Sequence, residues 1–147
     1  MSSKIFRILL TVEIILLFIQ FWIGMSINLF FIVPLHSAQN FAGYAGGNYV
    51  LEHIINGVTA LALAGFILSY GSRLRSRLIS ILSILAMVFA LVAVSTGATF
   101  ALRLRDDSLS MAMAVSFLII FAAYFSEFYL VERIQALSSN VSKTLEK

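Results

Sequence analysis

Four long apolar runs follow one another along the chain, and short polar stretches separate them. This pattern predicts helices over about 5–33, 49–70, 77–102 and 108–131. About 20 apolar residues in a helix cross a hydrocarbon core of about 30 Å, so each run is long enough to span a membrane. We therefore expect an all-α protein, an integral membrane up-and-down four-helix bundle, with one transmembrane domain over residues 1–147.

The first run ends at Pro34, the only proline of the chain. The residue before a proline disfavours helical geometry, so the helix is expected to stop there. The apolar stretch exceeds the hydrophobic segment of a signal peptide, about 7–15 residues, and no small-residue cleavage site closes it. We therefore interpret it as the first span.

Small and polar residues mark the helix faces expected to look into the bundle. In the first run, Glu13, Gln20, Gly24 and Asn28 are spaced to share one face, and facing lipid would leave such groups without partners. In the third run a stripe of small residues lets a neighbouring helix approach closely. Its members are Ser76, Ser80, Ser83, Ala90 and Gly97.

Composition agrees with a lipid environment. The chain is 61% hydrophobic and 12% charged, whereas soluble domains carry about 25% charged residues. The absence of cysteine excludes disulfides, thiolate metal sites, covalently attached c-type haem and cysteine nucleophiles. The net charge of +3 comes from basic residues at helix ends, so topology explains it better than nucleic-acid binding does.

The distribution of basic residues predicts the orientation. With four spans, most of them fall on one side, and only Arg103 and Arg105 fall on the other. The majority set is Lys4, Arg7, Arg73, Arg75, Arg77, Arg133, Lys143 and Lys147. Because lysine and arginine collect on the cytoplasmic side, we expect a multi-pass protein of the cell membrane with both termini in the cytoplasm.

A candidate pocket lies in the outer leaflet, where His53 begins the second helix. All four helices bring polar or sulfur-bearing groups to this depth. The expected pocket residues are Asn28, Glu52, Asn56, Gly57, Ser95 and Thr96. We expect the imidazole of His53 to be enclosed near Asn28, Thr96 and Met111.

Three interpretations of this pocket remain open. In the first, its groups hydrogen-bond one another across helices. In the second, His53 binds b-type haem or a metal such as copper, and a second ligand comes from His36, Met25, Met111 or Met113. In the third, the pocket takes a small molecule such as a quinone or a lipid headgroup, because intramembrane polar residues mark functional sites.

A second polar cluster is expected near the cytoplasmic side. Glu13 of the first helix and Glu127 of the fourth lie there, with Arg7, Arg77 and Tyr124 at similar depth. The carboxyl groups either handle protons or form ion pairs that snorkel to the interface. We favour the ion pair for Glu127, and leave the two alternatives equal for Glu13.

The sequence shows no catalytic constellation. It contains no HExxH motif and no phosphate-binding glycine loop, and the glycines of GYAGGNY do not follow a strand. A non-catalytic role is therefore favoured over an enzyme.

Several segments resemble a family of uncharacterised small four-span membrane proteins. They are QFWIGMSINLF with Pro34 following, HIING, STGATF and SLSMAMAVSF, about a third of the chain. The resemblance implies the four-helix fold, and a recurring family histidine and glycine correspond to His53 and Gly57. The chain is also faintly similar to one half of the haem A synthase bundle, through Glu52 and His53, although that enzyme's fourth-helix histidine has no counterpart here.

These observations together favour an accessory subunit or binding module of a larger membrane complex, in a respiratory setting. The expected partners are the lipid bilayer and other membrane subunits or a second copy of the chain. The alternative is electron transport by a haem or metal protein that uses His53. A third hypothesis is a proton pathway from Glu13 to the outer pocket.

Overall fold

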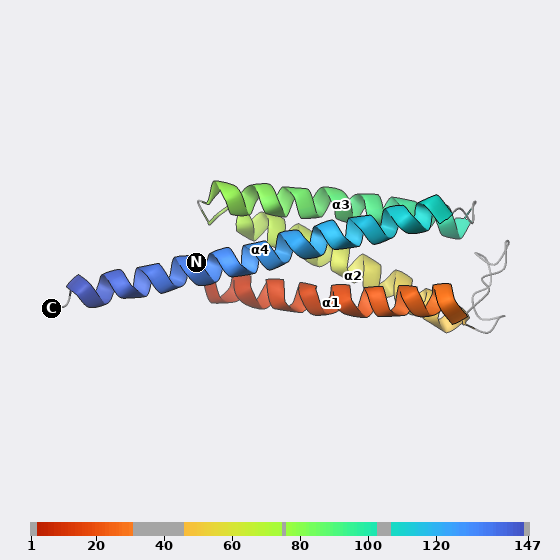
Figure 1. Cartoon of the computed structure of the whole chain (residues 1–147), viewed down its shortest axis with the longest axis horizontal. Coiled ribbons are helices and arrows are strands. Elements are labelled where there is room, and N and C mark those ends of the chain that lie inside the picture. The colour runs from red at the N-terminus through yellow and green to blue at the C-terminus, as the bar shows by residue number, and fades with distance from the viewer. Residues whose placement is uncertain (1–2, 31–45, 75, 103–106, 146–147) are drawn as a thin grey trace.

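The computed structural model describes residues 3–30, 46–74, 76–102 and 107–145. These residues form four helices (Figure 1). The helices are α1 (Ser3–Phe30), α2 (Gly47–Gly71), α3 (Arg77–Leu102) and α4 (Asp107–Leu145). The prediction of an all-helical, four-helix fold is confirmed for the described residues.

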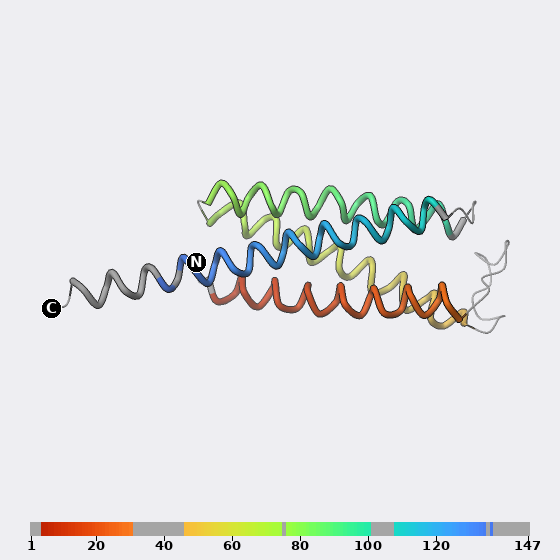
Figure 2. Tube along the Cα trace, viewed as in Figure 1, coloured from red at the N-terminus to blue at the C-terminus, as the bar shows by residue number. Residues whose placement is uncertain are grey.

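The helices pack in a closed ring. Helix α1 contacts α2 and α4, and α3 contacts the same two helices. Successive helices run in opposite directions, and both chain termini lie toward the same end of the bundle (Figure 2). We call this end, where α1 begins and α2 turns into α3, the proximal end. At the distal end α1 and α3 finish and α2 and α4 begin.

The predicted helix boundaries agree with the structure within a few residues, except for α4. Pro34, the expected stop of the first helix, lies outside the described residues. Helix α4 has 39 residues, which corresponds to about 58 Å at 1.5 Å per residue. It therefore continues beyond the proximal end of the bundle (Figure 1). The predicted span 108–131 is its apolar part, and the polar tail continues as helix.

Local chemistry explains the start and the end of α2. Gly46, the residue before the helix, has a φ of 99°, in the left-handed region that glycine adopts without steric cost. Its carbonyl accepts the first helical hydrogen bond, from the amide of Val50 at 3.2 Å. At the other end, the amides of Ser72, Arg73 and Leu74 donate to the last carbonyls of α2, so α2 closes in a tight turn before α3.

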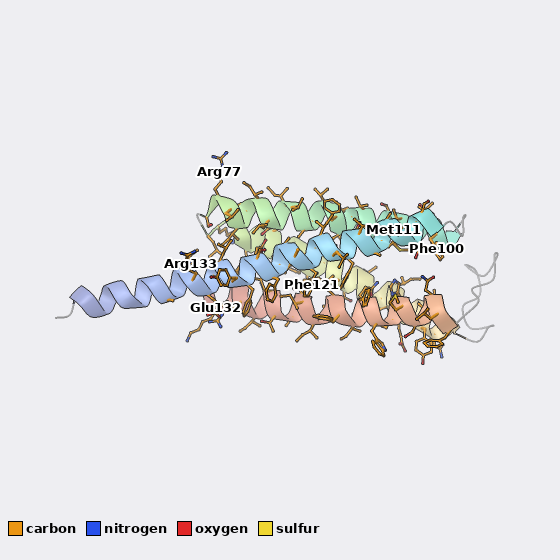
Figure 3. All side chains as sticks on the ribbon, in the orientation of Figure 1. Arg77, Phe100, Met111, Phe121, Glu132 and Arg133 are labelled. Carbon is orange, nitrogen blue, oxygen red and sulfur yellow. The ribbon has the colours of Figure 1, made fainter. Side chains whose placement is uncertain are left out.

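The outer surface of the bundle is apolar. All four helices are long and apolar enough to cross a membrane, over Lys4–Phe30, Gly47–Gly71, Arg77–Phe100 and Ser108–Ile134. Large apolar side chains point outward, such as Trp22, which is 75% exposed, and side chains project from the bundle along its whole length (Figure 3). This surface is consistent with a multi-pass membrane protein.

Burial is concentrated in the proximal half of the bundle. Phe6, Leu10, Ile67, Ile79 and Tyr124 are almost fully buried there. By contrast, residues 18–30, 91–100 and 108–115 include no buried side chain. In this distal half α1 meets α4 through stacked Phe21 and Phe117, whose ring centroids are 4.9 Å apart. Most buried residues thus lie in the proximal half, although Gly47 and Val50 of α2 are buried at the distal end.

Candidate functional site: two polar clusters in the bundle

The first cluster lies between α1 and α2 and is centred on Gln20. Its Nε2 lies 3.1 Å from Nε2 of His53. Because an amide nitrogen can only donate, the imidazole Nε2 accepts this hydrogen bond. In a neutral imidazole the hydrogen is then on Nδ1. The carboxamide of Gln20 therefore sets the tautomer of His53.

Asn56 completes this cluster, one helical turn further along α2. Its Nδ2 donates to Oε1 of Gln20 at 2.8 Å and to the backbone carbonyl of Leu16 at 3.1 Å. Gln20 thus uses both ends of its carboxamide to join two successive turns of α2. Hydrogen bonds between membrane helices contribute about 0.6 kcal/mol each, so this cluster stabilises the α1–α2 pair.

Two glycines allow the helices to approach closely here. A methyl carbon placed on Gly24 would lie 3.0 Å from Cε1 of His53, and one on Gly57 would lie 3.1 Å from Nε2 of Gln20. Both distances are shorter than an ordinary van der Waals contact. The imidazole and the carboxamide therefore occupy the space that these glycines leave open.

One donor of the cluster has no partner. Nδ1 of His53 is buried and makes no hydrogen bond. With Nε2 occupied by Gln20, a metal or haem iron has no free lone pair on this ring unless Gln20 moves. The arrangement instead suits a hydrogen-bond acceptor, such as a carbonyl or a phosphate oxygen, next to Nδ1.

The other residues of the predicted outer pocket make hydrogen bonds of their own or are exposed. Asn28 donates to Oγ of Ser110 at 3.3 Å, which joins α1 to α4. Ser95 and Thr96 donate to carbonyls of their own helix, and Glu52 is exposed. The contacts of His53 described above come from α1, whereas the sequence suggested all four helices.

The proposed sulfur ligands differ in their exposure. Met25 is 41% exposed and Met111 is 65% exposed. Met113 is half-buried, and its sulfur would lie 3.3 Å from a methyl carbon placed on Gly97 of α3. His36 lies outside the described residues. Within the described ranges, no group of three or more histidine, aspartate or glutamate side chains is placed to hold a metal.

The second cluster lies in the proximal half, which contains most of the buried residues. Glu127 of α4 is 0% exposed, and its Oε1 accepts a hydrogen bond from Oγ of Ser83 on α3 at 2.8 Å. Glu13 of α1 is 1% exposed. Tyr124 is fully buried one turn before Glu127 and lies within electrostatic range of both carboxyl groups.

The favoured interpretation of Glu127 as a snorkelling ion pair is wrong. Its side chain is completely buried, and its hydrogen-bond partner is a serine. The ion pair of this region joins Arg7 to Glu132 instead. The guanidinium of Arg7 also lies 5.8 Å from the ring centroid of Phe128. The side chain that contacts the carboxyl group of Glu127 is therefore Ser83 of α3, and not Arg7 or Arg77.

The sequence contained signals for residues of the two clusters that were not among the predicted site residues. Gln20 and Gly24 share the spacing of Glu13 and Asn28 along α1, which indicated a face directed into the bundle. Ser83 belongs to the small-residue stripe of α3, and it is 1% exposed. These patterns identified inward faces, but they did not show which helix each face contacts.

No protein-family model, curated protein or solved structure matches this chain.

Proposed function

We propose that this chain is an integral protein of the cell membrane, with both termini in the cytoplasm, that works as a non-catalytic accessory subunit of a larger membrane complex. The proximal end carries most of the lysine and arginine residues, which supports its placement on the cytoplasmic side. The distal end then lies in the outer leaflet.

The main observation in favour of a binding role is the uneven distribution of buried residues along the bundle. In the distal half, α1, α3 and α4 bury no side chain over residues 18–30, 91–100 and 108–115. The proximal half contains most of the buried residues, and large apolar side chains are exposed in both halves. Membrane helices associate through van der Waals packing and interhelical hydrogen bonds. Because α1, α3 and α4 bury few residues within the distal half of the bundle, this half is available for contact with the helices of a partner subunit.

The Gln20–His53–Asn56 cluster supports this assignment. It holds α1 and α2 together where few residues are buried, so the distal half presents a defined pair of helices. The setting that we propose for this complex is respiratory.

Site-directed photo-crosslinking in the native membrane tests the proposal. A photoreactive residue at Met111, on the distal half, is expected to give one crosslinked product with a partner of fixed stoichiometry. The same residue at Ile81 on the proximal half of α3, also apolar and 51% exposed compared with 65% for Met111, is the control. Equal crosslinking at both positions, or none at Met111 with the chain extracted as a monomer in mild detergent, would contradict the assignment.

The alternative function is haem binding and electron transport. For Nε2 of His53 to bind iron, its hydrogen bond with Gln20 must first break. A visible absorption spectrum of the purified chain checks this directly. A Soret band that disappears in His53→Ala but remains in Glu52→Ala would replace the accessory-subunit proposal with a haem protein.

A further inference from the structure

The proximal cluster collects oxygen atoms from three helices in the interior of the bundle. Glu13 comes from α1, Ser83 from α3, and Tyr124 and Glu127 from α4. Each of these side chains is at most 2% exposed. Four oxygen-bearing side chains are thus removed from both water and lipid.

Among the described residues, several of these oxygen atoms have no hydrogen-bond partner. They are Oε2 of Glu13, Oε2 of Glu127 and the phenolic oxygen of Tyr124. A buried polar atom without a partner costs about 1–3 kcal/mol. The Arg7–Glu132 ion pair and the Phe18–Phe121 contact lie on either side of this level of α1 and α4. Glu13, Tyr124 and Glu127 therefore lie at similar depth in the interior, where one ligand can contact them together.

The surrounding charges do not supply a partner for these oxygen atoms. Arg7 of α1 pairs with Glu132 of α4, and Arg77 of α3 is exposed and points away from the bundle (Figure 3). From α2 come Gly71 and the half-buried Tyr70, which packs on the same core. Within the described residues, neither Glu13 nor Glu127 forms an ion pair with a basic side chain.

Carboxylate and hydroxyl oxygens are the ligands of hard cations. We propose that Glu13, Ser83, Tyr124 and Glu127 form an intramembrane binding site for a small hard cation. The cation compensates the negative charge of the buried carboxylates, which protons neutralise when no cation is bound. Because carboxylates bind metal ions only when deprotonated, protons compete for the site.

Gly71 of α2 leaves the space that the hydroxyl of Ser83 occupies next to Glu127. A methyl carbon placed there would lie 2.5 Å from Oγ of Ser83. The helix α2 therefore approaches α3 so closely that the hydroxyl is held against Glu127.

Thermal unfolding of the full-length chain in detergent tests the proposal. Sodium, potassium, magnesium and calcium chloride are each compared with choline chloride at equal ionic strength, at pH 8 and at pH 6. We expect one of these cations to raise Tm in a saturable way, because a ligand that binds only the folded state stabilises it. The midpoint concentration is expected to be higher at pH 6.

Variants assign the effect to the cluster. Glu13→Gln and Glu127→Gln are expected to weaken the apparent affinity at least about tenfold, and Tyr124→Phe, which retains the ring volume, is expected to weaken it less. Glu52→Gln, an exposed carboxyl at the distal end, is the control and should titrate like the unchanged chain. A Tm that follows ionic strength alone, or a cation effect that survives in both glutamine variants, would overturn the cation site.

Discussion

At the scale of single residues, the most informative side chains are polar groups that form hydrogen bonds between helices. Gln20 is the clearest example, because its carboxamide contacts His53 through the nitrogen and Asn56 through the oxygen. A change at Gln20 therefore affects two residues of α2 at once.

We predict that Gln20→Leu lowers the free energy of unfolding by about 1 kcal/mol, from two interhelical hydrogen bonds of about 0.6 kcal/mol each. Steric trapping or titration with a denaturing detergent measures this change. The control is Thr59→Val, because the hydroxyl of Thr59 bonds only to the carbonyl of Ile55 in its own helix. A loss at Thr59 as large as the loss at Gln20 would contradict the importance of the bonds between helices.

At the scale of helices, α2 shows how one element uses glycine in different ways. Gly57 leaves space for Gln20 of α1, and Gly71 leaves space for Ser83 of α3. Gly65 lies between them, and a methyl carbon placed on it would meet no neighbouring atom within 4 Å. The same residue type thus serves two helix contacts and one position without a close neighbour.

This difference predicts opposite effects of alanine. Gly71→Ala is expected to lower stability by about 1–3 kcal/mol, since the new methyl group displaces Ser83 and disrupts its bond to Glu127. Gly65→Ala is expected to be neutral or to raise stability by up to about 1 kcal/mol, because alanine favours the helix. Comparing the two unfolding curves checks the packing of α2 against α3, and a similar result for both variants would refute it.

Much of the element scale could be predicted from the sequence. The four apolar runs predicted the helices, and the spacing of Glu13, Gln20 and Gly24 indicated the inward face of α1. The partners of these residues could not be predicted, because periodicity shows a direction around one helix and not the helix that lies opposite. The expected convergence of four helices on His53 therefore remained a hypothesis, and the structure places Gln20 and Gly24 of α1 beside this ring.

At the scale of the whole molecule, the orientation in the membrane is the property with the widest consequences. It decides whether the proximal carboxyl cluster lies nearer the cytoplasm and whether the Gln20–His53–Asn56 cluster lies in the outer leaflet. The chain contains no cysteine, so single introduced cysteines report their own position without background.

We predict that a membrane-impermeant maleimide labels Asn48→Cys in intact cells and labels Ser72→Cys only after the membrane is permeabilised. Both positions are exposed, and they lie at the distal and proximal ends of α2. The positive-inside distribution of lysine and arginine is the physical basis for this prediction. The reverse labelling pattern would invert the topology and place the carboxyl cluster near the outer surface.

The sequence alone determined that this chain forms four helices with apolar surfaces, because the length and periodicity of apolar runs are local properties that need no knowledge of neighbours. It also indicated which faces of α1 and α3 turn inward. Only the tertiary structure decided that Gln20 meets His53 and that Ser83 meets Glu127, since residues 33 and 44 positions apart are brought together by the way the helices cross. The low burial over residues 18–30, 91–100 and 108–115 was also decided by the tertiary structure, because burial depends on which side chains of neighbouring helices meet.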